Sequence, residues 1–342
     1  MIRTRPRRAG LFALALGLSL LVAGCGDSDD SPGGGDGGQD GGGGTDGKTI
    51  AFVGYGNENP WGAAYNKTLE AALDGTGVTI NDLTSMDPGT QIQNFNQAVS
   101  QSPDLIVAAL VDTAAAVVPI QKAEQAGVPV LIVDGRPDPA VEDLVMSVLS
   151  DNPLLGELAA ENLIEGLEAQ GRDSGSVIVL KGTESMLVTQ DRMEGFDAKM
   201  ATAPQFEVIE VQDTNWDPAL SGEVAQQLFA KHGCDGIQGA YGMADYMAMP
   251  IVQAAKQAGC EVGGEQGLVV TGGNCFKVGI DAIKAGELYG TATEDPITIA
   301  EQTADYIERY FNGDNPPQSE LVEEHRVTAE NVDEFADQCS QA

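Results

Sequence analysis

The chain has 342 residues, enough for two domains of ordinary size. It contains 52 acidic and 18 basic side chains, which gives a formal net charge of −34. This balance argues against binding to nucleic acid or directly to anionic lipid, because phosphate recognition needs a basic face. The acidity favours solubility and by itself identifies no ligand.

The N-terminus has the layout of a secretory signal. Four arginines among the first eight residues precede an apolar run over 11–22, which is too short to cross a bilayer comfortably. The run ends in Leu-Val-Ala-Gly-Cys25, which resembles the bacterial lipobox, in which the cysteine becomes the first mature residue and carries lipid. We therefore expect a lipoprotein signal peptide at 1–24 and a lipid anchor at Cys25. A plain secretory signal with an incidental cysteine is the alternative.

A low-complexity segment follows the cysteine. Residues 26–47 comprise 22 residues, of which 11 are Gly and 6 are Asp, with no apolar side chain among them. Such a composition cannot be buried, so we expect 25–47 to form a solvated tether with a reach of roughly 25 Å.

From Lys48 onward, short apolar runs alternate with longer amphipathic ones, a pattern typical of βαβ units. The predicted strands are 50–54, 78–83, 105–110, 130–133, 145–149, 177–180, 208–211, 236–241, 268–271 and 289–292. The predicted helices are 61–73, 91–101, 114–125, 153–169, 190–200, 218–231, 247–257 and 278–285. Two later features, 302–311 and 321–322, follow the second set and are expected to return to the first sheet.

This pattern predicts an α/β protein with two doubly wound parallel-sheet lobes in tandem. The chain would cross between them near 150–152, 294–295 and 323–324, which makes a three-crossing hinge. The N-terminal lobe would consist of 48–150 and 294–323, and the C-terminal lobe of 151–293 and 324–342. A cleft between two such lobes can close around a small ligand.

Enzyme motifs are absent from the sequence. It has no Gly-x-Ser-x-Gly elbow, no phosphate-binding loop and no His-Glu-x-x-His, and the Gly54-Tyr-Gly56 turn lacks the third glycine of a dinucleotide site. The two histidines, His232 and His325, leave little for acid–base chemistry. We therefore expect a protein that is not an enzyme and that uses no cofactor or metal.

Four cysteines remain if Cys25 carries lipid, an even number in an exported chain, and they allow three pairings. We favour Cys234 with Cys260, because each precedes an apolar run in consecutive strand–helix units. That choice leaves Cys275 with Cys339, which would tie the C-terminal tail to the body. A zinc site is not expected, since no two of these cysteines have close ligand spacing.

The turn Tyr55-Gly-Asn-Glu-Asn-Pro-Trp61-Gly62 lies between the first predicted strand and the first helix. Ligands of open parallel α/β sheets bind at this end of the strands. Trp61 is either a wall of a sugar site or a packing residue at the helix start. The only other tryptophan, Trp216, also lies in a loop after a predicted strand. Two indole faces across a cleft suit a sugar ring, whose C–H faces are apolar and whose hydroxyls point outward.

In order and spacing, several short motifs resemble the type I periplasmic binding proteins of sugar ABC transporters, and within them the ribose-binding proteins. They are Asn59-Pro60-Trp61, Ser150-Asp151-Asn152, Arg192-Met-Glu-Gly195-Phe196, Asp217 and the segment 286–296. The resemblance covers the chain from Lys48 to the mid-320s. It implies an extracytoplasmic solute-binding lipoprotein, expected to be a monomer, that captures a monosaccharide and delivers it to a membrane permease.

The resemblance also implies a set of ligand contacts. Asn59 and Asp134 would bond sugar hydroxyls, and Trp61 and Trp216 would sandwich the ring. The full predicted set is Asn59, Trp61, Asp134, Arg136, Gln190, Trp216, Asp245, Asn274 and Glu294. Arg192 is expected to stabilise a lobe through a salt bridge rather than to contact the ligand. Several of these residues have a structural alternative as helix caps, turn residues or hinge geometry.

The departures from the ribose-binding pattern bear on specificity. Gln190 replaces an arginine, Gly135 separates Asp134 from Arg136, and Ala244 precedes Asp245 where asparagine is usual. Asn274 falls where the family usually has aspartate, and Glu294 where ribose binders have glutamine. Gly62 replaces a second aromatic residue, which predicts extra room for a larger sugar. The ligand class therefore carries over, and ribose itself does not. The alternatives are a sensor for a chemoreceptor or histidine kinase, and the same fold binding a nucleoside, polyol or furanone signal.

Overall fold

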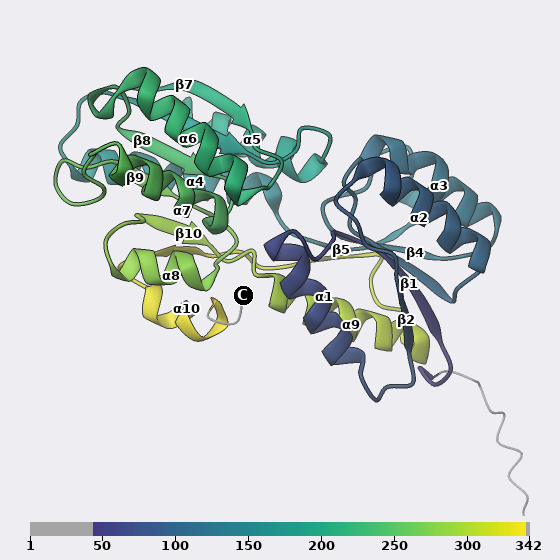
Figure 1. Cartoon of the computed structure of the whole chain (residues 1–342). Coiled ribbons are helices and arrows are strands. Elements are labelled where there is room, and N and C mark those ends of the chain that lie inside the picture. The colour runs from purple at the N-terminus through teal and green to yellow at the C-terminus, as the bar shows by residue number, and fades with distance from the viewer. Residues whose placement is uncertain (1–43, 340–342) are drawn as a thin grey trace, which may run out of the picture. The chain divides into compact units, whose positions relative to one another are not determined.

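The structure of this chain, a computed structural model, describes residues 44–339 (Figure 1). The predicted signal peptide, the lipid anchor at Cys25 and most of the predicted tether lie outside the described residues. The described part contains two six-stranded sheets with helices on their faces.

The first sheet, with its helices, forms lobe A. Its strands are β1 (Thr49–Val53), β2 (Thr79–Asp82), β3 (Leu105–Ala108), β4 (Val130–Asp134), β5 (Met146–Leu149) and β11 (Ser319–Leu321). They are ordered β11-β5-β4-β3-β1-β2, and every neighbouring pair is parallel. The helices of this lobe are α1 (Pro60–Leu73), α2 (Pro88–Gln101), α3 (Thr113–Gln125) and α9 (Pro296–Asn312), with a short 3-10 turn, η1 (Glu142–Leu144).

The second sheet, with its helices, forms lobe B. Its strands are β6 (Gly175–Lys181), β7 (Phe206–Asp213), β8 (Gly239–Gly242), β9 (Val269–Thr271), β10 (Gly290–Ala292) and β12 (Arg326–Thr328). The order is β12-β10-β9-β8-β6-β7, and only the β10–β12 pair is antiparallel among the pairs described. The helices are α4 (Asn152–Ala169), α5 (Leu187–Met200), α6 (Pro218–His232), α7 (Asp245–Gln257), α8 (Lys277–Lys284) and α10 (Val332–Cys339), with the 3-10 turn η2 (Cys234–Gly236).

Alternating side chains on each central strand fill separate cores on the two faces of a sheet. In β1, Ile50 and Phe52 pack with the residues of α1 and α9, whereas Ala51 and Val53 pack with those of α2 and α3. Figure 1 shows α1 beside α9 and α2 beside α3 around this sheet. Because successive strand residues point to opposite faces, a strand covered on both sides is apolar on both faces, as residues 50–53 of β1 are.

An Asp or Asn followed by Pro begins several of the helices. Asn59, Asp87, Asp217 and Asp295 each accept a hydrogen bond from a backbone N–H in the first turn of the helix that follows. Each is followed by a proline at the first helical position, where the missing N–H costs nothing. These caps fix the points at which the chain turns from the carboxyl end of a strand into a helix.

Three connections join the two lobes. The chain leaves β5 for α4 through Ser150–Asn152, returns from β10 to α9 through Thr293–Asp295, and passes from β11 to β12 through residues 322–325. The predicted pair of doubly wound sheets with three crossings is therefore confirmed. The memberships of β11, α9 and β12 support the predicted domain boundaries, which stay a proposal.

The structure differs from the sequence prediction mainly near the C-terminus. Helix α9 begins at Pro296, six residues before the feature noted at 302–311, because Asp295 caps it through the backbone N–H groups of Ile297 and Thr298. The β-branched residues in this first turn resemble an extended segment when the sequence alone is considered. Strand β12 and helix α10 were not predicted as elements.

Both disulfides lie in lobe B. Cys234 is bonded to Cys260, and Cys275 to Cys339, which is the pairing favoured from the sequence. The first closes a separation of 26 residues and the second a separation of 64, which ties α10 to the loop after β9. Linking residues this far apart in the chain restricts the unfolded state and thereby stabilises the lobe.

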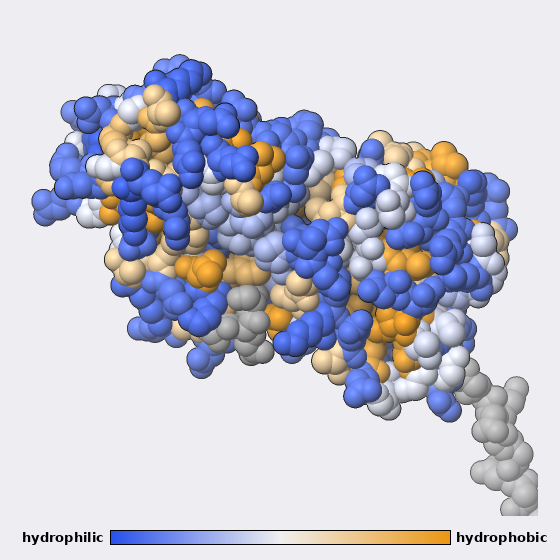
Figure 2. Space-filling view, viewed as in Figure 1, coloured by the Kyte–Doolittle hydropathy of each residue, from blue (hydrophilic) through white to orange (hydrophobic). Residues whose placement is uncertain are grey.

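The surface is largely hydrophilic. Figure 2 shows polar residues over most of the visible face, with hydrophobic residues in small separate groups. The exposed large hydrophobic residues in the described region are scattered single positions such as Val118, Val211 and Leu321. None of the helices within residues 44–339 is both long and apolar enough to cross a membrane.

Candidate functional site

The carboxyl ends of the strands of both sheets lead into one small cavity. Its walls come from the β1–α1 turn, β4 and the β2–α2 loop of lobe A, and from α5, the β7–α6 loop, α7 and the β9–α8 loop of lobe B. The lining residues are Tyr55, Asn59, Trp61, Met86, Asp134, Met186, Val188, Arg192, Trp216, Tyr246 and Asn274. This is the position in which open α/β sheets bind ligands.

The cavity is nearly filled by its own side chains. The centre of a water-sized sphere can occupy about 20 Å³ of it, close to what a single buried water needs. Ligand pockets commonly measure roughly 300–1,000 Å³. A ring-sized ligand therefore enters only if the two walls separate or the lining side chains move.

Trp61 forms part of the wall on the side of lobe A. Its indole stacks on Tyr65 with a centroid distance of 5.0 Å and meets Tyr55 edge-on at 5.4 Å. Its Nε1 donates to Glu294 Oε1 at 2.9 Å. One face of the indole is thus covered by Tyr65, so only the opposite face is available to a ligand. Trp61 therefore fills both of the roles that were alternatives in the sequence: it packs at the start of the helix, and it forms a wall of the cavity.

Asn59 likewise combines two roles. Its Oδ1 accepts from Gly62 N at 2.9 Å and caps α1, while its Nδ2 donates to the hydroxyl of Tyr246 in lobe B at 3.4 Å. The residue lines the cavity and is almost completely buried. Asn59 therefore caps the helix and also places its side-chain amide in the wall of the cavity.

Asp134 is the carboxylate that the cavity exposes most directly. It ends β4 with a φ of +69°, a left-handed conformation that is costly for a residue other than glycine and is found often at functional sites. Its Oδ2 accepts from the Tyr55 hydroxyl at 3.0 Å. Its Oδ1 is buried and makes no hydrogen bond of good geometry within the described residues. The side chains of Glu294 and Ser150 nevertheless lie close enough to lower the pKa of this carboxyl. An acceptor without a partner in such a place suits a ligand hydroxyl.

Trp216 lines the same cavity from lobe B. Asn215 and Trp216 have φ values of +54° and +58°, so strained backbone presents the indole as well. The Arg192 guanidinium lies 5.4 Å from the centroid of the ring, and the indole rests against the backbone of Gly182. Its Nε1 is buried without a hydrogen-bond partner among the described residues.

Arg192 is the centre of the buried polar network. Its guanidinium donates to Asn152 Oδ1 at 2.8 Å, to Met243 O at 3.2 Å, to Asn274 Oδ1 at 2.8 Å and to Glu294 Oε2 at 3.0 Å. The predicted structural role is therefore present. Arg192 also lines the cavity, and the expectation that it does not contact the ligand stays a prediction.

Glu294 lies in the second crossing and is fully buried. Besides its bonds to Trp61 and Arg192, it accepts from Ser150 Oγ at 3.5 Å and from Asn274 Nδ2. Both oxygens are thus used by protein groups from both lobes. We infer that Glu294 positions the residues around the cavity, whereas the sequence placed it among the ligand contacts.

The carboxyl groups of this network are held at unusual proton affinities. Burial raises the pKa of Asp134, an effect opposed by the charge of Arg192. Burial and the charge of Asp134 together raise the pKa of Glu294 well above its ordinary range. Burial by itself lowers the pKa of Arg192, but Glu294, Tyr241 and Asp134 together more than offset this effect, and the guanidinium stays protonated. One cation therefore serves several buried carboxyl groups, and groups of this kind gather at functional sites.

Besides Glu294, three of the predicted ligand contacts are absent from the lining of the cavity. Arg136 is partly exposed and makes a bidentate ion pair with Asp191 of α5, with distances of 2.8 and 2.9 Å. Gln190 is exposed and donates to Glu184 O at 2.8 Å. Asp245 is buried behind the wall, where it accepts from Phe276 N at 2.8 Å. A direct role of these three in binding stays a prediction, to which the structure offers these other roles.

The prediction of extra room at Gly62 is wrong. A Cβ at this position would lie 2.7 Å from the carbonyl oxygen of Gly56 and 3.0 Å from Tyr55. The glycine faces the backbone of the preceding turn and not the cavity. It is present because the first turn of α1 packs tightly on that backbone.

Five lining residues were not predicted from the sequence: Tyr55, Met86, Met186, Val188 and Tyr246. Tyr55 had a usable signal, because it directly follows the first strand in the turn that was already singled out. The methionines and Val188 look like ordinary core residues, and nothing in their spacing distinguishes them.

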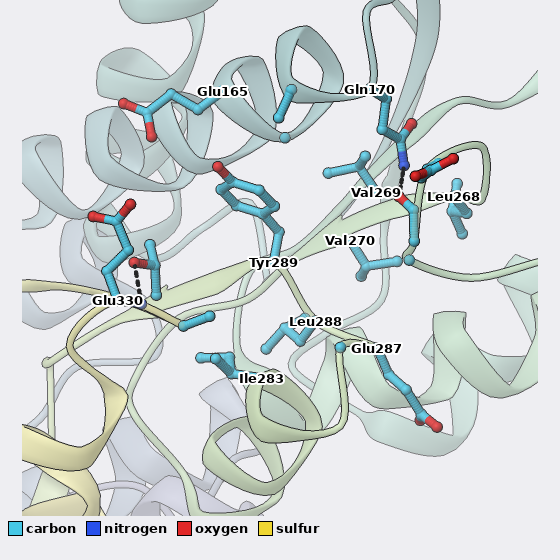
Figure 3. A pocket seen from close by; sticks show the side chains of 18 of the residues that line it. Glu165, Gln170, Leu268, Val269, Val270, Ile283, Glu287, Leu288, Tyr289 and Glu330 are labelled. Atoms are coloured by element: carbon cyan, nitrogen blue, oxygen red, sulfur yellow. Dashed lines mark hydrogen bonds between the residues drawn. The ribbon is translucent and has the colours of Figure 1, made fainter.

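A larger cavity, about 420 Å³ on the same measure, lies within lobe B (Figure 3). Leu268 and Tyr289, which line it, directly precede β9 and β10, and Gln170 follows the end of α4. Figure 3 shows Glu165 and Tyr289 toward one end and Gln170 toward the other. The cavity thus lies at the amino ends of these strands, opposite to the edge where α/β sheets bind ligands. We assign the candidate site to the smaller cavity because of its polar network and strained backbone.

Comparison with known proteins agrees with this geometry. A model of the periplasmic binding protein domain matches residues 50–315. The fructose import binding protein FruE of Bifidobacterium longum is 26% identical over 94% of this chain and 94% of its own length. The galactofuranose-binding protein YtfQ of Escherichia coli is 28% identical over 63% of this chain and 68% of its own length. These relatives are binding proteins and not enzymes.

Solved structures share the fold. The crystal structure of a galactofuranose-binding protein superimposes with a TM-score of 0.78 at 23% identity, covering 85% of this chain and 98% of that one. The arabinofuranose-bound protein of the arabinose ABC transporter from Shewanella sp. ANA-3 gives a TM-score of 0.76 at 20% identity, covering 86% and 96%. The chain belongs to the periplasmic binding protein family, with the type I fold and the solute-binding role of that family.

Proposed function

We propose that this chain captures a monosaccharide or a sugar-like polyol between its lobes and delivers it to the permease of an ABC importer. The observation that carries the proposal is Asp134 Oδ1, a buried acceptor that lacks a good hydrogen bond within the described residues and lines a cavity with two indoles. A carboxylate bonds hydroxyl groups strongly and rejects analogues that lack them.

The aromatic residues supply the apolar part of the recognition. Trp61 and Trp216 line the cavity from different lobes, as an arrangement that holds a ring between two indole faces would require. Stacking of a sugar ring on an aromatic side chain is worth roughly 0.5–1.5 kcal/mol beyond area burial, by analogy with aromatic pairs. Asn59 and Asn274 would then bond further hydroxyls, because an amide both donates and accepts.

We further propose that Cys25 carries lipid and that the segment after it, up to residue 43, tethers the body to the membrane. Residues 44–47, which the sequence placed in the tether, instead hydrogen-bond to lobe A, with Gly44 N donating to Phe311 O and Gly47 N to Gly77 O. The basic flank, the short apolar run and the small residues before Cys25 support this proposal. Such an anchor would keep the ligand-loaded lobes within reach of a membrane permease. Mass spectrometry of the protein purified from membranes, before and after Cys25→Ser, would detect the acyl modification or its absence.

The names of the relatives suggest which ligands to try first. They include binding proteins for fructose, for galactofuranose, for xylitol and for ribose. These ligands share several adjacent hydroxyl groups on a small carbon skeleton, and each can offer donors to Asp134.

A thermal-shift and tryptophan-fluorescence screen with pentoses, hexoses and polyols tests the proposal. A ligand present at 100 times its Kd should add about 2.7 kcal/mol to the free energy of unfolding and so raise Tm. For the best ligand, Asp134→Ala should weaken binding by roughly 10–100-fold, since hydrogen bonds to charged groups contribute about 1.5–3 kcal/mol. The proposal fails if the whole panel leaves Tm and emission unchanged.

A further inference from the structure

A second cavity opens directly beside the candidate site. It measures about 520 Å³ on the same measure and is lined by residues of both lobes, among them Glu58, Asp87 and Val111 of lobe A and Thr183 and Asp217 of lobe B. We call it the vestibule. It lies at the carboxyl ends of β1, β2, β3, β6 and β7, the same edge as the small cavity of the candidate site.

We call the small cavity of the candidate site the inner cavity. Three residues line both it and the vestibule, namely Asn59, Met86 and Trp216. Of these, Trp216 has its Nε1 buried without a partner in the described part of the chain, and it has a strained backbone. Methionine is unbranched and adapts its shape easily. Because the inner cavity alone has room for about one water, a ligand that displaces these shared side chains reaches the vestibule as well.

The polar groups of the vestibule are hydrogen-bond acceptors for the most part. One oxygen of Glu58 accepts from Met86 N at 3.1 Å, and one oxygen each of Asp87 and Asp217 caps the helix that follows. An ionised carboxylate has about four acceptor sites, so each of the three keeps capacity for a further donor. The lining contains no Lys, Arg or His. An occupant with hydroxyl donors would be favoured there, and an anionic occupant would be repelled.

We propose that the vestibule holds a hydroxyl-bearing, uncharged substituent on the sugar that occupies the inner cavity. The chain would then bind glycosides or disaccharides at least as tightly as the parent monosaccharide, and would reject phosphorylated or carboxylated sugars. This inference rests on the proposed function, since it concerns the same site and extends its ligand class.

Isothermal titration with matched probes tests it. The sets are D-ribose with 2-hydroxyethyl β-D-ribofuranoside and ribose 5-phosphate, D-fructose with sucrose and fructose 6-phosphate, and D-galactose with lactose and galacturonate. We expect at least one set in which the uncharged glycoside binds as tightly as the monosaccharide, while the anionic analogue binds at least about tenfold more weakly because of three nearby carboxylates.

The outcomes separate the two proposals. If monosaccharides bind and every glycoside or disaccharide binds much more weakly, the vestibule inference is overturned and the proposed function stands. If a phosphorylated sugar binds as tightly as its parent, the charge argument is overturned. If no member of any set binds, the proposed function fails and this inference fails with it.

Variants give an independent check. In the triple variant Glu58→Gln, Asp87→Asn and Asp217→Asn, the amides keep the cap acceptors and remove three charges. The ratio of Kd between the anionic and neutral probes should fall at least about tenfold. The matched control is Glu168→Gln, Glu261→Gln and Glu308→Gln, which changes net charge equally on residues outside both cavities and should leave the ratio unchanged. Equal ratios in the two triple variants would contradict the inference.

Thr183→Tyr, which fills the vestibule only, should weaken binding of the glycoside more than binding of the monosaccharide.

Discussion

Arg192 and Glu294 form an ion pair with an Nη2–Oε2 distance of 3.0 Å, and both side chains are almost completely buried. Arg192 belongs to α5 of lobe B, whereas Glu294 lies in the crossing from β10 to α9 and also accepts from Trp61 of lobe A. The pair therefore links one lobe, the hinge and the wall of the cavity.

Breaking this pair from one side should destabilise the protein strongly. Arg192→Met leaves the Glu294 carboxyl buried without its cation, which typically costs about 3–5 kcal/mol. The double variant Arg192→Met and Glu294→Gln removes both charges and should be more stable than the single variant. Lys256→Met, which breaks the exposed Lys256–Glu287 pair, should cost less than about 1 kcal/mol. Urea unfolding measures all three, and equal losses for Arg192→Met and Lys256→Met would contradict the role of the pair.

The two tryptophans should report ligand binding unequally. Trp61 is stacked on Tyr65 and hydrogen-bonded to Glu294, so its surroundings change little, whereas Trp216 has a free indole N–H within the described structure. The chain has only these two tryptophans, so each single Phe substitution isolates the other. We expect the ligand-induced change in emission to disappear in Trp216→Phe and to persist in Trp61→Phe. The reverse pattern would contradict the inference that the surroundings of Trp216, and not those of Trp61, change when the ligand binds.

Trp216→Ala should also weaken binding of the best ligand by at least about 30-fold, because area burial and stacking together are worth about 2–3 kcal/mol.

Gly182 sets the position of the Trp216 indole from behind. A Cβ at residue 182 would overlap the ring, so Gly182→Ala must displace it. We expect a shifted emission maximum, weaker ligand binding and a loss of about 1–3 kcal/mol in stability, as in other overpacked sites. Gly222→Ala in α6 is the control, because its Cβ would meet Pro250 at an ordinary 3.4 Å. That variant should keep the emission and affinity of the parent; matching behaviour of the two variants would rule out the packing argument.

The Arg136–Asp191 ion pair joins the lobes outside the cavity. Because the arginine is partly exposed, its removal in Arg136→Ala should raise the Kd of the ligand by only about two- to fivefold, and less at high salt. A direct ligand contact, as the sequence suggested, would instead cost more than about tenfold and persist at high salt. Titrations at low salt and at about 1 M salt, where the Debye length is about 3 Å, distinguish the two roles. Lys277→Ala, which breaks an ion pair within α8, is the matched control.

Glu324 should make stability depend on pH. It lies in the third crossing, and burial raises its pKa to about 8, with a further contribution from Asp134 and an opposing one from Arg192. Because the folded state binds this proton more tightly, the stabilisation is complete below the ordinary pKa of glutamate, about 4.3, and is lost as pH rises toward 8.

Glu324→Gln mimics the protonated form. The variant should therefore be only slightly more stable than the parent protein near pH 4.5, and the difference in Tm should grow up to about pH 8. The corresponding gain in the free energy of unfolding should be at most a few kcal/mol. Glu323→Gln changes a neighbouring side chain that is 86% exposed and should show no such trend. A pH-independent difference for Glu324→Gln would show that the folded state does not hold the proton.

Much of the fold could be predicted because strand and helix signals agree along the chain. Apolar runs such as that of β1 are fully buried, and Asp–Pro or Asn–Pro pairs mark the helix starts. The site was predicted only in part. The loops that contain Asn59, Asp134 and Trp216 could be found from their position after strands, but side-chain direction could not. Gln190 and Arg192 differ by two positions in one helix, and only the second points inward.

The prediction drawn from the single substitution at Gly62 was wrong. Gly62 was expected to open space because a family position had lost an aromatic side chain. The three-dimensional neighbours of that glycine are backbone atoms of the preceding turn, and sequence contains no direct record of such a neighbour. The burial of Glu294 could not be predicted either, because its four hydrogen-bond donors come from four separate segments of the chain.

The return of the chain to the first sheet has a consequence for biosynthesis. Ile299 and Ile307 of α9 pack in one core with Trp61 and Tyr65 of α1, and β11 completes the edge beside β5. These residues leave the ribosome only after all of β6 to β10. The half of the protein that is made first therefore keeps an apolar face uncovered until synthesis is nearly finished, and should fold last or together with the other half. A delay of this kind would suit the export that the proposed lipid anchor at Cys25 implies.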